Sequence, residues 1–391
     1  MKTYYLKCKN KICLSFEADE KLTTLSNIKL LDDFIFIKQK YNEYSPRQWL
    51  EFILNISLIP MQRPNYKGLI ENFLNYKKLI LNNNYLNLCN SFWICSQEES
   101  CKLNWEDVNY FDHFNNDSCN YFLDYKAKLA ETNRLQIKSP SWFIDGDMLK
   151  AWVKVDEEIH LYKRNSKFAN KNLYDVYSEY FASQVAKFLN LPAVDYKITK
   201  YGKHFVSDCK LFTNKDFSFI PFSKIIDPNI NCNNLKLCSQ IAFYYGKELF
   251  EDLMVFDALI CNGDRHLNNF GMMLDNNSGI LTKPAPIFDF NNSLIFDYPI
   301  YLKSIAKTAF LNDYENRKTR FFESFNQQLK IFIRKRHLDW IKQLKKFKFK
   351  QPNKIKMDMK YLKFINKFFK KRIKKAEQYL IEKGYIKENE R

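Results

Sequence analysis

Hydrophobic and polar residues alternate in several stretches of this chain, a pattern that predicts β-strands with one buried face. Residues 3–8 and 11–16 alternate in this way and suit a hairpin. Residues 152–163 contain two alternating runs joined by an acidic turn, which predicts a second hairpin. A third hairpin is expected at residues 272–281, where Asn-Asn-Ser-Gly separates two apolar runs. Sheets should therefore form a substantial part of the fold.

Other stretches follow the helical period of three to four residues. Residues 46–54 and 66–81 suit helices, and residues 253–261 are apolar almost throughout, which predicts a buried helix. Residues 172–189 also suit a helix, in which four residues can share one apolar stripe. These are Val176, Tyr180, Val185 and Leu189.

Basic residues are concentrated in the last quarter of the chain. Residues 301–391 contain 27 Lys and Arg against 9 Asp and Glu, whereas the first 300 residues carry no net charge. A long helix is predicted there, starting at Pro352-Asn353 and ending at Gly384. Its apolar stripe comprises Ile355, Met359, Leu362, Ile365, Phe369, Ile373, Ala376 and Leu380. Packing of this helix on its own domain is the favoured interpretation, and binding of an acidic partner, nucleic acid or an anionic membrane remains open.

The overall composition favours a globular protein. A chain of 391 residues, 46% hydrophobic, can form two or three domains. The spacing of Cys89, Cys95, Cys101 and Cys119 does not match a zinc ribbon or finger. No signal peptide is evident, and residues 49–60 are too short and too polar to cross a bilayer. The sequence therefore predicts a cytoplasmic protein with reduced thiols and no transmembrane segment.

Three polar side chains form the most informative set in the sequence. Asp264 follows the apolar helix, Asn269 comes five residues later, and Asp289 lies behind a short apolar strand. Asn269 and Asp289 offer the oxygen ligands that Mg²⁺ takes beside nucleotide phosphates. Asp264 would accept the proton of an attacking hydroxyl or orient that hydroxyl. Each motif alone would only predict a turn, but together they predict an ATP-dependent phosphotransferase.

Four further residues have expected supporting roles. Gly263 should allow the sharp turn that starts the catalytic loop, and His266 should hydrogen-bond the backbone to keep the loop in shape. Lys163, at the end of a predicted strand, can reach the phosphates, and Glu179 on the next helix can pair with it. The alternative interpretation is a solvated strand lysine and a surface glutamate.

The run Asn262-Gly-Asp-Arg-His-x-x-Asn-x-Gly271 resembles the catalytic loop of HipA-like serine/threonine kinases, relatives of the phosphoinositide 3/4-kinase fold. Asp289 stands where that family keeps its second metal carboxylate. Residues 139–152 are similar to the phosphate-loop hairpin of the family, and residues 158–163 to the strand that bears its nucleotide lysine.

The resemblance implies further site residues. Backbone N–H groups around Gly146 and the Lys150 ammonium would face the triphosphate, and backbone groups near Leu211 would meet adenine. Because family members can modify a serine in their own phosphate loop, Ser139 or Ser141 is a candidate for autophosphorylation. The expected cofactors are ATP and Mg²⁺, and the expected acceptor is a serine or threonine of a protein substrate.

The expected fold class is α+β, with a two-lobed protein-kinase-like arrangement. Residues 126–212 would form a β-rich N-lobe, beginning with a linker at 126–138, and residues 213–391 a helical C-lobe. Residues 1–125 would form an N-terminal α+β accessory domain, similar in part to a segment fused to some HipA-like kinases. Two alternatives stay open: a lipid or small-molecule kinase of the same fold, and a non-catalytic nucleotide- or nucleic-acid-binding module.

Overall fold

The structure, a computed structural model, describes residues 1–19, 22, 24–32, 34, 36, 45–56, 81, 83–124, 138–168, 171–226, 234–301, 307–353, 355 and 357–386. The helix predicted at residues 66–81 and the linker predicted at 126–138 lie almost wholly outside these ranges. The chain divides into two compact units. The first comprises Met1–Lys163, Lys210–Ile220 and Met272–Lys283, and the second Arg164–Cys209, Pro221–Gly271 and Pro284–Arg391.

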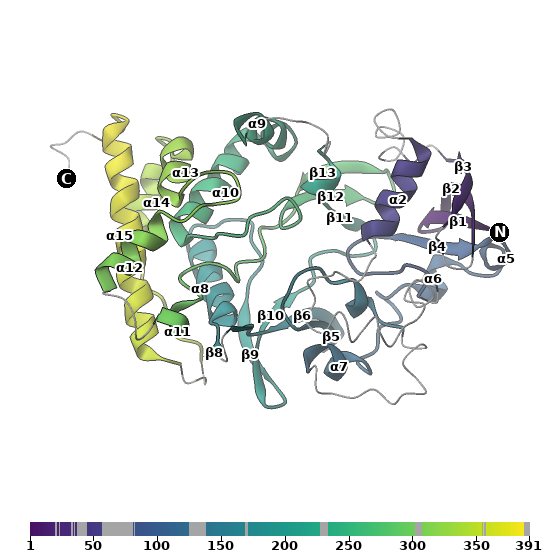
Figure 1. Cartoon of the computed structure of the whole chain (residues 1–391), viewed down its shortest axis with the longest axis horizontal. Helices are drawn as coiled ribbons and strands as arrows, with labels where there is room; N and C mark the ends of the chain where they lie inside the picture. Colours follow the sequence, from purple (N-terminus) through teal and green to yellow (C-terminus); the bar gives the residue numbers. More distant parts are fainter. Residues whose placement is uncertain are drawn as a thin grey trace. The chain divides into compact units, whose positions relative to one another are not determined.

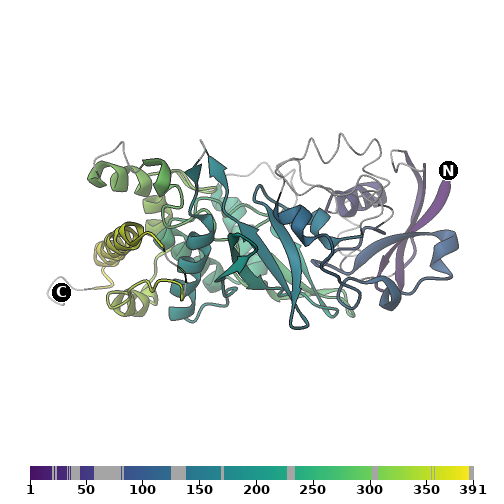
Figure 2. The same ribbon diagram turned by 90° about the horizontal axis from the view of Figure 1, so that it is seen from below.

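The first unit begins with an antiparallel sheet whose strand order is β3-β2-β1-β4 (Figure 1). Its strands are β1 (Lys2–Cys8), β2 (Lys11–Ala18), β3 (Leu25–Leu30) and β4 (Phe92–Ser96). The first two form the predicted hairpin, with Leu6 opposite Leu14 and both fully buried. In two views β1–β3 lie together beside the N-terminus (Figures 1 and 2). Helix α2 (Pro46–Ile56) confirms the helix predicted from residue 46.

A second part of the first unit contains the other two predicted hairpins. The strands β5 (Lys150–Val155) and β6 (Glu158–Arg164) pair antiparallel around Asp156 and Glu157. Both turn residues have positive φ, 47° and 65°, as a tight two-residue hairpin requires. The hairpin at residues 272–281 is formed by β12 (Gly271–Asp275) and β13 (Ile280–Pro284), next to β11 (Phe217–Pro221).

Residues on both sides of position 125 share one hydrophobic core. Trp93 and Trp105 are buried with Ile144, Trp152 and Ile159 in a single cluster. Short helices flank this core: α5 (Gln97–Ser100), α6 (Trp105–Val108), α7 (Cys119–Leu123) and the 3₁₀ turn η2 (Pro140–Phe143). The domain boundaries predicted at residues 125 and 212 stay a prediction.

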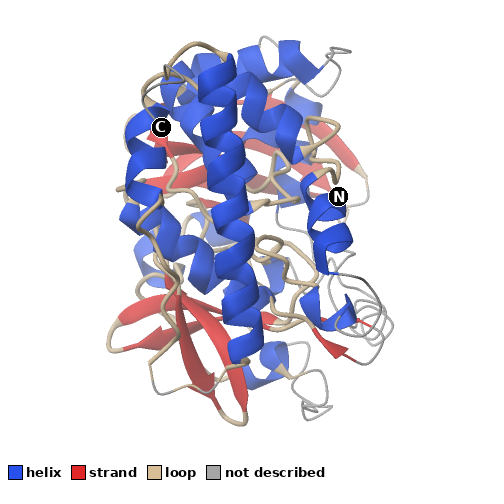
Figure 3. Cartoon of the chain, turned by 90° about the vertical axis from the view of Figure 1, so that its left-hand side faces the viewer, coloured by secondary structure: helices blue, strands red, loops and turns tan. Residues whose placement is uncertain are grey.

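Helices make up most of the second unit (Figure 3). It contains α8 (Asp175–Phe188), α9 (Asn234–Tyr245), α10 (Lys247–Ile260), α11 (Tyr298–Tyr301), α12 (Lys307–Glu315), α13 (Phe325–Phe332), α14 (His337–Leu344) and α15 (Met359–Glu382). It also contains the 3₁₀ turn η3 (Phe222–Lys224), the short strands β7 (Lys167–Phe168) and β8 (Lys171–Asn172), and a hairpin of β9 (Lys197–Tyr201) and β10 (His204–Lys210). Helix α10 is buried on nearly all sides, which explains its nearly continuous apolar sequence.

The long basic helix α15 packs on its own unit, against α10, α13 and α14. It starts later than predicted, because the Asp358 carboxylate caps it by accepting from Lys360 N at 2.8 Å. Most of the predicted stripe is buried, but Met359 is 47% exposed. Arg372 lies outside this stripe but is fully buried. Binding of an acidic partner or nucleic acid by the remaining basic residues stays a prediction.

The result is a mixed α/β fold of antiparallel hairpins and helices. The two-lobed arrangement with an accessory domain stays a prediction. None of the described helices combines the length and apolar character that crossing a bilayer requires. The nine cysteines within the described ranges are free thiols.

Candidate active site

The candidate catalytic loop starts directly after α10. Helix α10 ends at Ile260, and Cys261 takes the left-handed conformation with φ = 52°. The expectation that Gly263 makes this turn is wrong, because its φ is not positive and the left-handed residue is Cys261, two residues earlier. Asn262 then stabilises the turn: its Oδ1 accepts from Asp264 N at 3.2 Å and its Nδ2 donates to Asp257 Oδ1 at 3.1 Å.

A buried ion pair fixes this loop to α10. Arg265 and Asp257 are 3% and 0% exposed. Arg265 Nε donates to Asp257 Oδ2 at 2.8 Å, and Nη2 donates to Oδ1 at 3.1 Å. Burial lowers the pKa of Arg265, but the charge and hydrogen bonds of Asp257 raise it, and the net shift is upward. The guanidinium is therefore charged and held in one orientation.

The same guanidinium joins the catalytic loop to the loop that carries Asp289. Arg265 Nη1 donates to Asn269 O at 2.7 Å and to Phe288 O at 2.6 Å. Arg265 thus holds the backbone of Asn269, one candidate metal ligand, and of Phe288, which directly precedes the other candidate, Asp289. Neither Arg265 nor Asp257 was predicted as a site residue, although both lie in the sequence that suggested the site.

The side chains of the catalytic loop are arranged by bonds within the loop. Asn269 Nδ2 donates to Asp264 O at 2.8 Å, so the amide oxygen Oδ1 is the atom left to face a cation. His266 Nδ1 accepts from Asn268 N at 3.2 Å, and His266 Nε2 lies 3.9 Å from Asp264 Oδ2. The backbone bond fits the structural role expected for His266, which stays a prediction.

Asp289 adopts the left-handed conformation with φ = 62°. Its backbone N–H donates to Tyr196 Oη at 3.1 Å, and its carbonyl lies 3.5 Å from Asn262 Nδ2. Strained backbone of this kind persists where the surroundings enforce it, often at functional sites. An amide oxygen and a carboxylate, both presented by fixed backbone, suit the oxygen coordination and low protein ligand number of Mg²⁺.

Arg320 contacts the candidate base and was not predicted. Its Nε donates to Asp264 Oδ1 at 3.1 Å, and Nη2 donates to the same oxygen. The side chains of Arg320 and Asp264 are 55% and 27% exposed. An ion pair this open to water contributes at most about 1 kcal/mol, so it can exchange partners readily. No local pattern in the sequence signals a contact across 56 residues.

In the hairpin that was expected to bind the nucleotide, two lysines are buried. Lys150 and Lys163 are paired residues of β5 and β6, so both side chains lie on the same face of the hairpin. They are 4% and 3% exposed, which excludes a solvated strand lysine at 163. Lys150 Nζ donates to Asp145 O and lies above Gly146, whose φ is 98°.

Glu179 is fully buried on α8, which excludes a surface glutamate at this position. Its Oε2 accepts from Ser207 Oγ. Asp175, one turn earlier, accepts from Ser166 N at 3.3 and 3.2 Å, and burial raises the pKa of its carboxyl to about 6. The pairing of Glu179 with Lys163 stays a prediction.

The two candidate phosphorylation sites are buried. Ser139 Oγ accepts from Ser118 Oγ at 2.8 Å and from Ser141 N at 3.2 Å, and Ser141 Oγ accepts from Trp152 N at 3.0 Å. Leu211 follows the end of β10, and its N–H donates to Ile159 O at 2.8 Å. Phosphorylation of either serine requires this segment to open.

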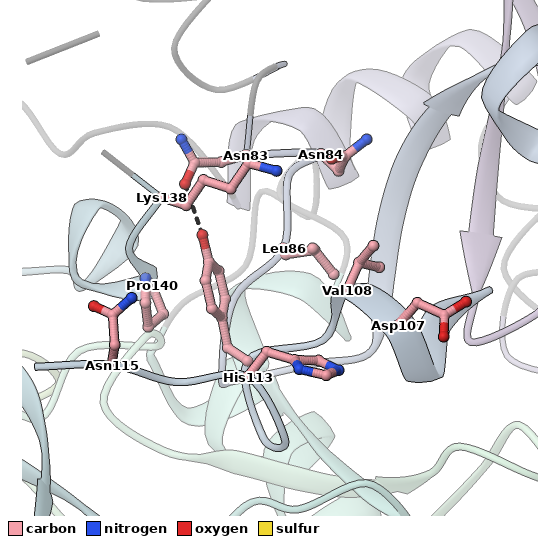
Figure 4. Close-up of a pocket in the computed structure, with 10 residues that line it drawn as sticks. Asn83, Asn84, Leu86, Asp107, Val108, His113, Asn115, Lys138 and Pro140 are labelled. Carbon is pink, nitrogen blue, oxygen red and sulfur yellow. Dashed lines mark hydrogen bonds between the residues drawn. The ribbon is translucent and has the colours of Figure 1, made fainter. Parts of the chain in front are cut away.

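The candidate residues fall into two groups. Asp264, His266, Asn269, Asp289 and Glu179 belong to the second unit, and Ser139, Ser141, Gly146, Lys150, Lys163 and Leu211 to the first. A cavity of about 210 Å³ in the first unit is lined by none of them (Figure 4). Its walls are Asn83, Asn84, Leu86, Asp107, Val108, Tyr110, His113, Asn115, Lys138 and Pro140.

Two solved structures are similar to this chain. One is a proinflammatory kinase of Helicobacter pylori, CtkA, which is 19% identical, with 61% of this chain and 93% of that chain covered and a TM-score of 0.45. The other is HipA of Shewanella oneidensis MR-1, from a toxin–antitoxin complex with HipB and operator DNA. It is 12% identical, with 96% and 97% covered and a TM-score of 0.48.

No family model and no curated protein matches the chain. The chain thus resembles HipA-like kinases in its catalytic-loop sequence and is similar in structure to a HipA protein.

Proposed function

We propose that this protein is a Mg²⁺-dependent kinase that transfers the γ-phosphate of ATP to a serine or threonine of a protein substrate. The observation that carries the proposal is the Arg265 guanidinium, which binds Asp257 and the carbonyls of Asn269 and Phe288. Through these bonds a carboxylate-bearing loop and an amide-bearing loop are held to one buried helix. Phosphoryl transfer requires mainly such positioning and charge neutralisation.

Each residue has a distinct proposed role. Asn269 and Asp289 hold Mg²⁺, which when bound neutralises charge on the phosphates. Asp264 receives the proton of the acceptor hydroxyl or orients that hydroxyl. The buried Lys150 and Lys163 supply positive charge for the phosphates from one face of the hairpin. Glu179 orients Lys163, and the backbone near Leu211 receives adenine.

Self-phosphorylation of Ser139 or Ser141 is part of the proposal. Both hydroxyls are buried and hydrogen-bonded inside the first unit. A phosphate on either serine would therefore keep the segment around residues 139–141 in an opened form. Intact-mass spectrometry after incubation with ATP and Mg²⁺ tests this directly. A gain of one phosphate that is lost in Ser139→Ala or Ser141→Ala supports it, and an unchanged mass contradicts it.

Binding measurements test the metal ligands separately from transfer. ATP affinity is measured with and without Mg²⁺ for the natural protein, Asn269→Ala and Asp289→Ala. Both variants should lose the Mg²⁺-dependent part of ATP binding, since each removes one oxygen ligand. Asn268→Ala is the matched control, because Asn268 is the exposed neighbour of Asn269 in the same loop. If Asn269→Ala and Asn268→Ala bind Mg²⁺ and ATP equally well, the metal assignment is wrong.

A further inference from the structure

The backbone that carries Arg320 is firmly anchored. Thr319 Oγ1 accepts from Phe321 N at 3.3 Å and from Phe322 N at 2.9 Å, which closes a tight turn. Phe321 and Phe322 are buried, and the Phe321 ring packs edge-on against Phe270 of the catalytic loop at 6.4 Å. The Cα of Arg320 is therefore held at a fixed position beside the catalytic loop.

The guanidinium of Arg320, in contrast, is open to solvent. Its side chain is 55% exposed, and Nε and Nη2 donate to one oxygen of Asp264. An anchored backbone with an exposed cationic end is suited to exchange one anion for another. The anion that Arg320 now binds is the candidate catalytic base itself.

We propose that Arg320 is a specificity-determining residue that recognises a carboxylate next to the acceptor hydroxyl of an acidic protein segment. This inference rests on the proposed function, because it assigns the acceptor of the same site. Without an acceptor, Arg320 pairs with Asp264. When an acidic segment docks, its carboxylate takes over the guanidinium, and Asp264 becomes available to the hydroxyl.

The transfer step then balances without a further reactant. The acceptor oxygen forms a bond with the γ-phosphorus, and the bond between that phosphorus and the β,γ-bridging oxygen breaks. The hydroxyl proton passes to Asp264, and ADP leaves with the electron pair of the broken bond. Arg320 stays on the acceptor carboxylate throughout and takes no proton, because a guanidinium remains charged.

The neighbouring cations favour a single carboxylate over a phosphate-rich headgroup. Arg317 donates to Asp297 Oδ2 at 2.8 Å and lies 4.2 Å from the centre of the Tyr314 ring. The Lys318 ammonium lies 3.5 Å from a carboxylate oxygen of Glu323. Arg320 is therefore the cation of this turn that faces the base, and one planar guanidinium matches one carboxylate.

The test compares two serine peptides that differ in one respect, with Glu or Gln beside the serine. Transfer by the full chain is measured for the natural protein, Arg320→Ala and Arg320→Lys. The Glu peptide should have an about 5-fold higher kcat/KM in the natural protein, as an ion pair at an exposed guanidinium provides. Arg320→Ala should bring the ratio close to one, and Arg320→Lys should give an intermediate ratio because lysine lacks the planar fork.

The control variant is Lys318→Ala, which removes an exposed cation two residues away and should keep the preference. Equal use of both peptides by the natural protein, or an unchanged preference in Arg320→Ala, would overturn the inference. Binding of the same peptides is measured separately. If no peptide is phosphorylated, the proposed function fails, whereas the difference in binding between the natural protein and Arg320→Ala still decides the role of Arg320.

A lipid acceptor is the other outcome. Vesicles of phosphatidylcholine with and without phosphatidylinositol are added to the same assay. Arg320-dependent phosphorylation of the lipid, without a preference for the Glu peptide, would replace the acidic segment by an anionic headgroup and contradict the proposal.

Discussion

The buried ion pair between Arg265 and Asp257 provides a quantitative test of the site. Arg265→Met removes four hydrogen bonds: two to Asp257 and one each to the carbonyls of Asn269 and Phe288. It also leaves the Asp257 carboxylate, which is fully buried, with Asn262 Nδ2 as a neutral donor. Removing one partner of a buried pair costs about 3–5 kcal/mol of stability, so this loss is expected for Arg265→Met.

Asp257→Leu should cost a similar amount, because it leaves the guanidinium buried without its carboxylate. The double variant carries neither buried charge, and its loss should fall short of the sum of the two single losses by at least about 2 kcal/mol. Unfolding in urea, followed by circular dichroism, gives the four free energies of this cycle. Two losses below about 1 kcal/mol, or simple additivity, would refute the claim that this pair holds the loop.

Three further predictions concern Asp175, Gly146 and Arg372. Burial raises the pKa of Asp175 to about 6, so its contribution to stability is present below pH 4 and is lost as the pH rises through 6. Asp175→Asn should therefore become more stable relative to the natural protein by about 3 kcal/mol between pH 3.5 and 7.5, measured by urea unfolding. Gly146→Ala should cost about 1–3 kcal/mol, because φ is 98° and the new Cβ would lie 2.6 Å from Lys150 Nζ. Arg372→Met should cost about 1–3 kcal/mol in the same assay, since Ala258 O loses donors at 2.9 and 3.2 Å.

Features with a local cause could be predicted from the sequence. The hairpin of β5 and β6 follows from alternation around two turn residues, and the buried helix α10 follows from a run of apolar residues. The three central candidates, Asp264, Asn269 and Asp289, were recognised from residue type and spacing. The turn after α10 was assigned to Gly263 because glycine tolerates positive φ, but Cys261 takes that conformation under the constraint of its buried surroundings.

Features that depend on distant contacts could not be predicted in this way. The contact of Arg320 with Asp264 spans 56 residues, and a basic residue in a basic quarter of the chain carries no distinguishing signal. The complete burial of Glu179 and Arg372 depends on tertiary packing, which the helical pattern does not encode. Helix α15 starts later than predicted because Asp358 caps it, and several polar residues near position 353 could equally have been the cap.

The central claim is that Asp264 acts on an acceptor hydroxyl beside bound ATP. The direct measurement is transfer of labelled γ-phosphate to cell protein by the natural protein and by Asp264→Ala, with ATP binding measured in parallel. Asp339→Ala, which removes an exposed carboxylate on α14, is the matched control. Asp264→Ala should lose transfer at least about 100-fold while retaining ATP binding, and the control should keep both. Equal transfer by Asp264→Ala and the natural protein would contradict the account.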